Sequence, residues 1–395
     1  KMNNNLDHLT EYPFQYLSDL LKDIEKEPEE IIGLHIGEPK GKAPKEALDI
    51  ITNFSSDFSK YPTSTGDLSL REAYCEWLSD RFSVNYVNPD LHVLPLSGTR
   101  EGIFSFIQSV IDTTQNNPKV ILPNPFYKIY EGAAIMAGAE PFYVNAEESD
   151  GFKPNFDNIP ENIWKDCQLL ILCSPSNPTG YCLSKKEYEG LLAKAEKYDF
   201  LVCSDECYTD IYESNSNPPT GLLECDDLST LHSRSVVFHS LSKRSNLAGL
   251  RSGFICAGQE IIEKLSLYRT YHGVTLSFPT QKASAWAWSD RKHVTENRIE
   301  YDRKYTTAIS CLDTIDNLSR PPGGFYLWLK LPCDDEIFAK TLYQNEAILS
   351  LPGSYLAKEN NGVNPGKGYL RLAVVHDLET VSKAFTAVNK TLKEF

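Results

Sequence analysis

Short apolar runs alternate with longer stretches of helical periodicity along most of the chain, beginning near residue 46. The helical stretches, of which 100–111 and 184–198 are examples, repeat hydrophobic positions with the spacing of an amphipathic helix. Repetition of strand, helix and strand predicts an α/β fold, a largely parallel sheet covered by helices on both faces. The predicted strands are 92–96, 120–123, 141–145, 169–173, 200–203, 236–239 and 253–257.

The pattern changes past residue 280, where a single long helix is predicted from 280 to about 315. A strand at 325–331, a helix at 335–345, a strand at 368–375 and a closing helix at 378–393 follow. These elements predict a second, smaller α+β domain. We expect residues 46–289 to form the large domain, and residues 1–45 together with 290–395 to form the small one.

Composition narrows the range of partners. The formal net charge of -15 disfavours binding to a nucleic-acid backbone, and no apolar run is long enough to span a membrane. The ten cysteines show no Cys-x-x-Cys pair and no zinc-like spacing with histidine, so no metal site is expected. Several of them, Cys203 and Cys207 included, are interpreted as reduced packing residues, which is typical of a cytoplasmic protein.

Polar segments follow four of the predicted strands directly, at 97–100, 174–180, 204–208 and 240–244. Ligands of open parallel sheets bind beyond the carboxyl ends of the strands, so four such segments predict a single site. In the first segment Gly98, Thr99 and Arg100 open a helix. The free N–H groups of this helix suit a phosphate, although an ordinary helix cap has the same pattern.

Lys243 is the candidate nucleophile at this edge of the sheet. A lysine in a desolvated pocket near other cations has a lowered pKa and can form an imine; a solvated surface lysine is the alternative. Arg244 and Arg251 supply the cations, and the guanidinium of Arg251 matches the geometry of a phosphate. Ser240 and Ser242 add hydroxyl donors nearby.

Four further side chains have both a functional and a structural interpretation. Asp205 ends an apolar strand, where it would hold a pyridine nitrogen protonated or else form a helix cap or an ion pair. Tyr208 would donate to a phenolate oxygen and Tyr127 would stack on a flat ring, or both would simply pack. Arg371, in an otherwise apolar strand, would bind a carboxylate or face solvent at a sheet edge.

Together these residues resemble the fold-type-I aminotransferases that depend on pyridoxal 5'-phosphate (PLP), the aspartate aminotransferase superfamily of classes I and II. The resemblance extends from Gly37-Glu38-Pro39 to Arg371, nearly the whole chain. Its most specific parts are 174–180, 205–208 and 240–243, with Arg251 eight residues after Lys243. It implies a seven-stranded sheet sandwiched by helices, PLP as cofactor, amino acids and 2-oxo acids as substrates, and a homodimer with shared active sites.

The resemblance also implies a role for each matching residue. Lys243 would hold PLP as a Schiff base and move the proton, Asp205 would pair with the pyridine nitrogen, and Tyr208 would bind the phenolic oxygen. Tyr61 would reach the phosphate bound by the partner subunit. The other residues implied to contact the cofactor are Gly98, Thr99, Arg100, Tyr127, Asn177, Ser240, Ser242 and Arg251.

Substrate contacts are implied as well: Gly37, Asn177 and Arg371 would bind the α-carboxylate. Longer stretches at 124–134, 240–246 and 268–273 are similar to bacterial N-succinyldiaminopimelate aminotransferases of lysine biosynthesis, whose amino donor is glutamate. Leu247-Ala248-Gly249 departs from that family, in which a proline is common. Arg269 is a candidate contact for the distal carboxylate or, equally, an arginine on a helix surface.

Other functions would keep most of these residues. An aminotransferase specific for aspartate, for aromatic amino acids or for a broad set is one alternative. A PLP-dependent C–S lyase is another, but lyases of this fold usually carry a histidine where this chain has Ser176-Asn177-Pro178. A regulator of this fold would need an attached DNA-binding domain, and no basic helix-turn-helix pattern precedes the core.

Overall fold

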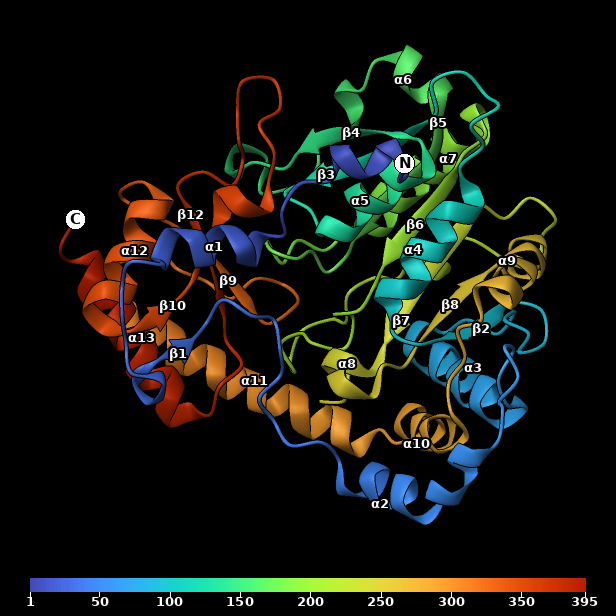
Figure 1. Cartoon of the computed structure of the whole chain (residues 1–395), viewed down its shortest axis with the longest axis horizontal. Coiled ribbons are helices and arrows are strands. Elements are labelled where there is room, and N and C mark those ends of the chain that lie inside the picture. Colours follow the sequence, from blue (N-terminus) through green and yellow to red (C-terminus); the bar gives the residue numbers. More distant parts are fainter.

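A seven-stranded sheet forms the centre of the computed structural model, which describes all 395 residues (Figure 1). The strand order is β2-β8-β7-β6-β5-β3-β4. Strands β3 to β7 are parallel, whereas β8 runs antiparallel to both of its neighbours. The predicted mainly parallel sheet is therefore confirmed. The strands are β2 Val93–Leu96, β3 Lys119–Asn124, β4 Glu140–Asn145, β5 Cys167–Cys173, β6 Leu201–Asp205, β7 Ser235–Ser240 and β8 Gly253–Ala257.

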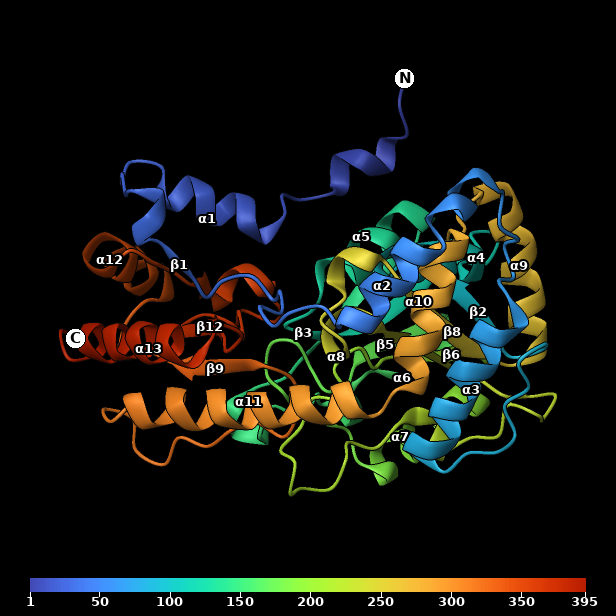
Figure 2. The same ribbon diagram turned by 90° about the horizontal axis from the view of Figure 1, so that it is seen from below.

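Apolar side chains cover both faces of this sheet, as parallel strands require. In β5, Leu169 and Ile171 pack into one hydrophobic cluster, whereas Leu170 and Leu172 pack into the other. Helices α4, α5 and α9 cover the first face, α3, α7 and α10 cover the second, and α2 packs on α10 (Figure 2). These helices are α2 Lys45–Asn53, α3 Leu68–Phe82, α4 Thr99–Val110, α5 Lys128–Ala137, α7 Lys185–Tyr198, α9 Gln259–His272 and α10 Phe278–Ser289; the short α6 Glu161–Asp166 precedes β5.

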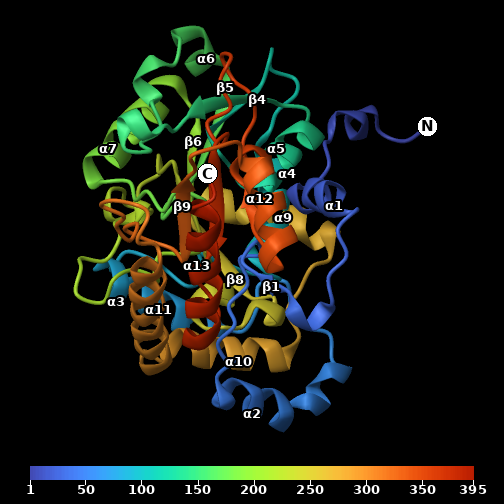
Figure 3. The ribbon, with the colours of Figure 1, turned by 90° about the vertical axis from the view of Figure 1, so that its left-hand side faces the viewer.

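A second body of structure lies beside the sheet, on the left in Figure 1 and toward the viewer in Figure 3. It holds a three-stranded antiparallel sheet of order β11-β12-β9 and a parallel pair, β1 and β10. Leu329, Phe338, Leu370 and Phe385 belong to a hydrophobic cluster of its own, which supports the proposed small domain of residues 1–45 and 290–395. Its elements are α1 Pro13–Leu21, β1 Ile32–Gly33, α11 Lys292–Cys311, β9 Tyr326–Lys330, α12 Asp335–Glu346, β10 Ile348–Leu349, β11 Leu351–Pro352, β12 Tyr369–Ala373 and α13 Leu378–Leu392.

The single helix predicted from 280 to 315 is wrong. The structure has two helices, α10 and α11, separated by Asp290 and Arg291. The Asp290 carboxylate accepts a hydrogen bond of 2.9 Å from the backbone N–H of His293 and lies 2.7 Å from its ring Nδ1. This contact caps the start of α11. Both helices bury apolar residues, so the hydrophobic periodicity continues across the break and does not reveal it.

The segments that follow β5, β6 and β7 meet the second body at the carboxyl edge of the large sheet. The chain makes one short helical turn, α8 Leu241–Arg244, immediately after β7. β2 runs in the same direction as β7 because β8 is antiparallel to both, so the segment at Gly98 reaches the same edge. None of the helices combines the length and apolar character needed to cross a membrane.

Candidate active site

A cavity of about 200 Å³ opens between the carboxyl edge of the large sheet and the second body. Three segments that follow strands β2, β5 and β6, together with α8 and β12, contribute to its lining. The residues singled out from the sequence that line it are Gly37, Thr99, Arg100, Tyr127, Asn177, Asp205, Tyr208, Lys243 and Arg371. Gly98, Ser240, Ser242 and Arg251 do not line it, although Gly98 adjoins Thr99 and Ser242 adjoins Lys243 in sequence.

Lys243 occupies α8, and the turn is set up by Ser240, whose Oγ accepts a 3.0 Å hydrogen bond from the backbone N–H of Ser242. The ammonium of Lys243 donates to the carbonyl oxygen of Gly37. Burial lowers the pKa of Lys243 to about 8, and Arg371 and Arg251 act in the same direction. The amine therefore loses its proton far more readily than an exposed lysine, as an imine-forming nucleophile or a proton carrier must.

Asp205 is the last residue of β6 and is only 5% exposed. Its Oδ2 accepts a 2.5 Å hydrogen bond from the hydroxyl of Tyr130, and its Oδ1 accepts one of 3.3 Å from the backbone N–H of Cys207. No cationic side chain lies within ion-pair distance of it, and burial raises its pKa. A buried carboxylate without a cation, facing a cavity, suits a ligand that carries a positive charge.

Arg371 lies in β12, the central strand of the small sheet, and is 4% exposed, so it does not face solvent at a sheet edge. Its Nη1 donates to Asn177 Oδ1 at 3.0 Å, and its Nη2 donates to the carbonyl oxygen of His35 at 2.7 Å. The guanidinium lies 4.4 Å from the ring centroid of Tyr326. Its Nε is buried and has no hydrogen-bond partner. The side chain is thus held in place with donors to spare, which suits a substrate carboxylate.

The start of α4 forms an anion-binding corner. Gly98, the N-cap of this 12-residue helix, has a φ of +80°. A Cβ at this position would lie 2.2 Å from Nη2 of Arg251, so only glycine lets the guanidinium come this close. The Nη1 of Arg251 donates to the carbonyl oxygen of Ala248 at 2.9 Å. A guanidinium beside a helix N-terminus suits a phosphate group.

Hydrogen bonds to tyrosine hydroxyls orient the other side chains that line the cavity. Arg100 Nε donates to the hydroxyl of Tyr127 at 2.7 Å, which directs the guanidinium to this phenol rather than to the corner at Gly98. The hydroxyls of Tyr208 and Tyr326 lie 3.0 Å apart, and burial raises the pKa of Tyr208 well above its ordinary value. Tyr208 therefore stays protonated and can donate a hydrogen bond.

Three tyrosines that line the cavity were not predicted as site residues from the sequence: Tyr12, Tyr130 and Tyr326. Cys207 was singled out from the sequence, but for a different role. Cys207 was interpreted as a packing residue, but it lines the cavity, with its Sγ 3.3 Å from Thr99 Oγ1. The sequence could have predicted Cys207 as a site residue, because it lies within the polar segment that follows β6. Tyr326 fits against Gly37 so closely that a Cβ there would lie 1.8 Å from its hydroxyl.

Arg269 and Tyr61, two further residues singled out from the sequence, lie outside the cavity. Arg269 is neither a cavity residue nor an arginine of the helix surface: it is 2% exposed and forms an ion pair of 2.7 Å with Glu101. That pairing leaves it unable to serve a distal substrate carboxylate. Tyr61 lies outside the cavity and is fully exposed in the single chain.

These features agree with PLP in chemical detail. Asp205 would face the protonated ring nitrogen, Lys243 would meet the aldehyde carbon, and the corner of Gly98 and Arg251 would hold the phosphate. A fold of this type with such a site defines a PLP-dependent enzyme that acts on amino acids.

The family follows from comparison with known proteins. The chain belongs to the class I and II aminotransferases, whose family model matches residues 29–388. It is 40% identical to an aminotransferase of Neisseria meningitidis of known structure, with a TM-score of 0.93 over 98% of this chain and 99% of the other. It is 36% identical to aminotransferase AspB of Helicobacter pylori, also of known structure. The TM-score is 0.89, over 98% of this chain and 100% of the other.

A curated relative is the LL-diaminopimelate aminotransferase of Dehalococcoides mccartyi strain CBDB1, 28% identical over 97% of each chain. The protein is therefore a PLP-dependent aminotransferase, and the predicted family, fold and cofactor are confirmed.

Proposed function

We propose that this aminotransferase transfers the amino group of glutamate to the 2-oxo acid from which N-succinyldiaminopimelate is made, in diaminopimelate and lysine biosynthesis. The sequence stretches 124–134, 240–246 and 268–273 support this substrate, since they resemble enzymes that use it. Curated relatives named for diaminopimelate support the same carbon skeleton.

One observation carries the amino-acid part of the proposal. Arg371 lines the cavity that also holds Lys243, and its guanidinium carries donor hydrogens that no protein group accepts. A buried cation with free donors favours a substrate that brings a carboxylate. Asn177 holds this guanidinium by its side-chain oxygen, so the carboxylate of any substrate would be bound in one orientation.

PLP, when bound, supplies a protonated aromatic ring that withdraws electrons from the carbon whose proton is lost. We assign the proton transfer at the substrate Cα to Lys243 Nζ, whose pKa near 8 lets it accept the proton and return it. Asp205 would keep the ring nitrogen protonated, and Tyr208 would donate to the phenolic oxygen. By fixing the carboxylate, Arg371 turns the Cα–H bond toward Lys243.

The same assignment gives the remaining residues supporting roles. Tyr127 would stack on the ring, Asn177 would contact both the phenolic oxygen and the substrate, and the backbone of Gly37 would help to bind the carboxylate. The phosphate is assigned to Gly98, Thr99, Arg100, Ser240, Ser242 and Arg251. Of these, Arg100 needs a change of side-chain conformation, since its Nε is bonded to Tyr127.

LL-diaminopimelate itself is a second candidate substrate, favoured by the names of the curated relatives. A half-reaction screen separates the candidates: the PLP enzyme is mixed with single amino acids, and conversion to the aminated cofactor is followed by absorbance. The proposal expects glutamate and N-succinyl-LL-diaminopimelate to react with the highest kcat/KM. Faster reaction of free LL-diaminopimelate would favour the second candidate. Faster reaction of aspartate or aromatic amino acids would reject both, and release of pyruvate and ammonia from cystathionine would indicate a lyase.

We also propose a homodimer in the cytoplasm, with Tyr61 reaching the phosphate site of the partner subunit. The ten free thiols support a reducing compartment. The full exposure of Tyr61 in the single chain supports the shared site. Mixing Tyr61→Phe and Lys243→Ala subunits tests it, because one site of each hybrid would contain both native residues. Recovered activity supports sharing, and a mixture no more active than Tyr61→Phe alone rejects it.

A further inference from the structure

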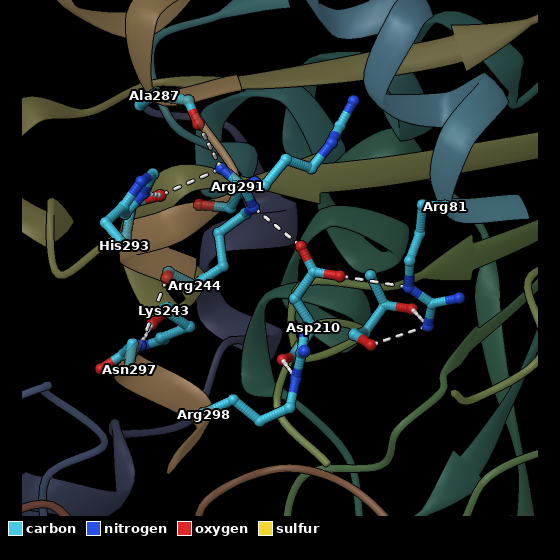
Figure 4. A network of polar contacts seen from close by, with 12 residues as sticks. Arg81, Asp210, Lys243, Arg244, Ala287, Arg291, His293, Asn297 and Arg298 are labelled. Atoms are coloured by element: carbon cyan, nitrogen blue, oxygen red, sulfur yellow. Dashed lines mark hydrogen bonds and ion pairs between the residues drawn. The ribbon is translucent and has the colours of Figure 1, made fainter. Parts of the chain in front are cut away.

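A buried ion pair lies just outside the cavity, between Asp210 and Arg244. The Asp210 Oδ2 accepts a 2.8 Å hydrogen bond from Arg244 Nε, and both side chains are almost fully buried. Neither residue lines the cavity, so neither can touch the substrate. Figure 4 shows Asp210 between Arg244 on one side and Arg81 on the other.

Arg244 directly follows Lys243 in α8. This helix has four residues, too few to be stable without tertiary contacts. The guanidinium of Arg244 supplies such contacts: its Nη1 donates to Ser245 Oγ at 3.0 Å and to the carbonyl oxygen of Ala287 at 2.9 Å. It also lies 4.8 Å from the ring centroid of Trp288. The turn that carries the amine is thus anchored through its neighbour, on the side away from the cavity.

A second contact reaches the same turn from α11. The side-chain Nδ2 of Asn297 donates to the carbonyl oxygens of Lys243 and Arg244, at 3.3 and 3.2 Å. Arg298, the next residue of α11, donates from Nε to the backbone oxygen of Asp210 at 3.0 Å. Figure 4 shows Asn297 at the turn and Arg298 at Asp210. Helix α11 belongs to the second body, which also contributes Arg371 to the cavity.

Asp210 belongs to the segment that carries Asp205 and Tyr208, both of which line the cavity. Arg81 fixes it from α3, with Nε donating to Asp210 Oδ1 at 3.1 Å and Nη2 donating to the Thr209 carbonyl at 2.8 Å. Burial opposes ionisation of Asp210, but Arg244 and Arg81 outweigh it and lower its pKa to about 2. The carboxylate is therefore charged at neutral pH.

We propose that the Asp210–Arg244 ion pair is a positioning device that holds the turn of Lys243 at a fixed place relative to the segment of Asp205 and Tyr208. The pair joins two stretches of chain whose side chains must address different atoms of the same ligand, beyond the point where β6 and β7 cease to pair. Asp210 and Arg244 are positioning residues in this account: they act through the backbone of Lys243. The proposal rests on the proton-transfer role assigned to Lys243.

The reactivity of the Lys243 amine in the cofactor-free protein tests the proposal without reference to turnover. The protein is pulsed with acetic anhydride across a range of pH, and modification of Lys243 is quantified by peptide mass spectrometry. In the native chain the modification of Lys243 is expected to reach half of its maximum at a pH of about 8, which is the midpoint followed below. In Asp210→Asn the turn loosens and the amine gains solvent, so the midpoint should move toward the ordinary lysine value of about 10.4.

Kinetics of the PLP-loaded enzyme provide the second readout. A displacement of the amine by about 1 Å is expected to lower kcat roughly 100-fold. KM should change little, because the carboxylate contacts at Arg371 are untouched. The matched control is Asp302→Asn, which breaks a different Arg–Asp pair, that of Asp302 in α11 with Arg320 at 2.5 Å, outside the cavity. It is expected to keep the Lys243 midpoint and kcat whatever it does to the melting temperature.

If Asp210→Asn does not fold, the double variant Asp210→Asn/Arg244→Met replaces it, because it removes the unpaired charge of Arg244 from the core. Arg81 loses its carboxylate partner in both variants but keeps its hydrogen bonds to Thr209 and to the carbonyl oxygen of Pro219. It lacks the same anchor, so the same shift in midpoint and the same loss of kcat are expected. A folded variant, single or double, with its Lys243 midpoint still near 8 and kcat within about threefold of native overturns the proposal. Failure of the underlying role of Lys243 is distinguishable, since it would appear as an active Lys243→Ala enzyme.

Discussion

Replacing Arg371 by lysine keeps the positive charge of the cavity but removes the planar fork of the guanidinium. In the native protein two nitrogens of this side chain are already committed, Nη1 to Asn177 at 3.0 Å and Nη2 to the carbonyl oxygen of His35 at 2.7 Å. The second hydrogens of Nη1 and Nη2 remain for a substrate carboxylate, and the buried Nε has no protein partner. A lysine ammonium has three hydrogens, of which the same two acceptors would occupy most.

The expected loss is therefore one charge-assisted hydrogen bond to the substrate, about 1.5–3 kcal/mol. At about 1.4 kcal/mol per factor of ten, kcat/KM for glutamate should fall roughly 10- to 150-fold in Arg371→Lys. The fall should exceed any change in cofactor binding, because this arginine is assigned to the substrate rather than to PLP.

Stopped-flow absorbance of the glutamate half-reaction measures this value directly. Glutamate is compared with the corresponding amine that lacks the α-carboxylate, for which native and Arg371→Lys enzymes should react at the same low rate. Arg320→Lys serves as the control, since Arg320 lies in the same part of the chain but outside the cavity. If Arg371→Lys loses as much activity toward the amine as toward glutamate, the carboxylate assignment is refuted.

Three other perturbations test separate parts of the account. Lys243→Ala should abolish transamination while the circular-dichroism spectrum stays native; substantial residual turnover would exclude it as the proton carrier. Asp205→Asn should raise the barrier to loss of the Cα proton by about 3 kcal/mol or more, which slows this step roughly 100-fold. α-Deuterated glutamate measures the rate of the step, and an unchanged rate would mean that another group protonates the ring. Asp210, whose pKa is held near 2, contributes stability that is present above its unfolded value of about 3.8 and is lost as pH falls toward 2. Asp210→Asn should therefore lose less stability than the native chain on acidification below about pH 4, by about 2 kcal/mol in urea titrations, and parallel profiles would contradict this.

The large sheet could be predicted because its strands bury both faces. In β5 every residue from Leu169 to Leu172 is fully buried, so the run reads as continuously apolar. The polar segments after these strands stood out for the same reason, and they led to Lys243 and Asp205. The strand pairs β1–β10 and β11–β12 were not predictable in this way, because three of their members have only two residues.

Contacts between distant segments account for most of what the sequence did not reveal. Tyr130 reaches Asp205 from a helix 75 residues earlier, and no local pattern distinguishes it from the packing aromatics around it. Arg269 looked like a surface arginine because its helix is mostly polar, yet its partner Glu101 lies 168 residues away. The Asp210–Arg244 pair likewise depends on how the segment after β6 meets the short helix α8 after β7.

The central claim is that Lys243 binds the cofactor, and reductive trapping tests it most directly. The protein is incubated with PLP, reduced with borohydride, digested and mapped by mass spectrometry. Two lysines line the cavity, Lys128 and Lys243, and Lys128 is paired with Glu131 at 2.8 Å. The account predicts stoichiometric pyridoxyl label on Lys243 alone. Label on Lys128 or another lysine in place of Lys243, or no label with PLP in excess, would contradict it.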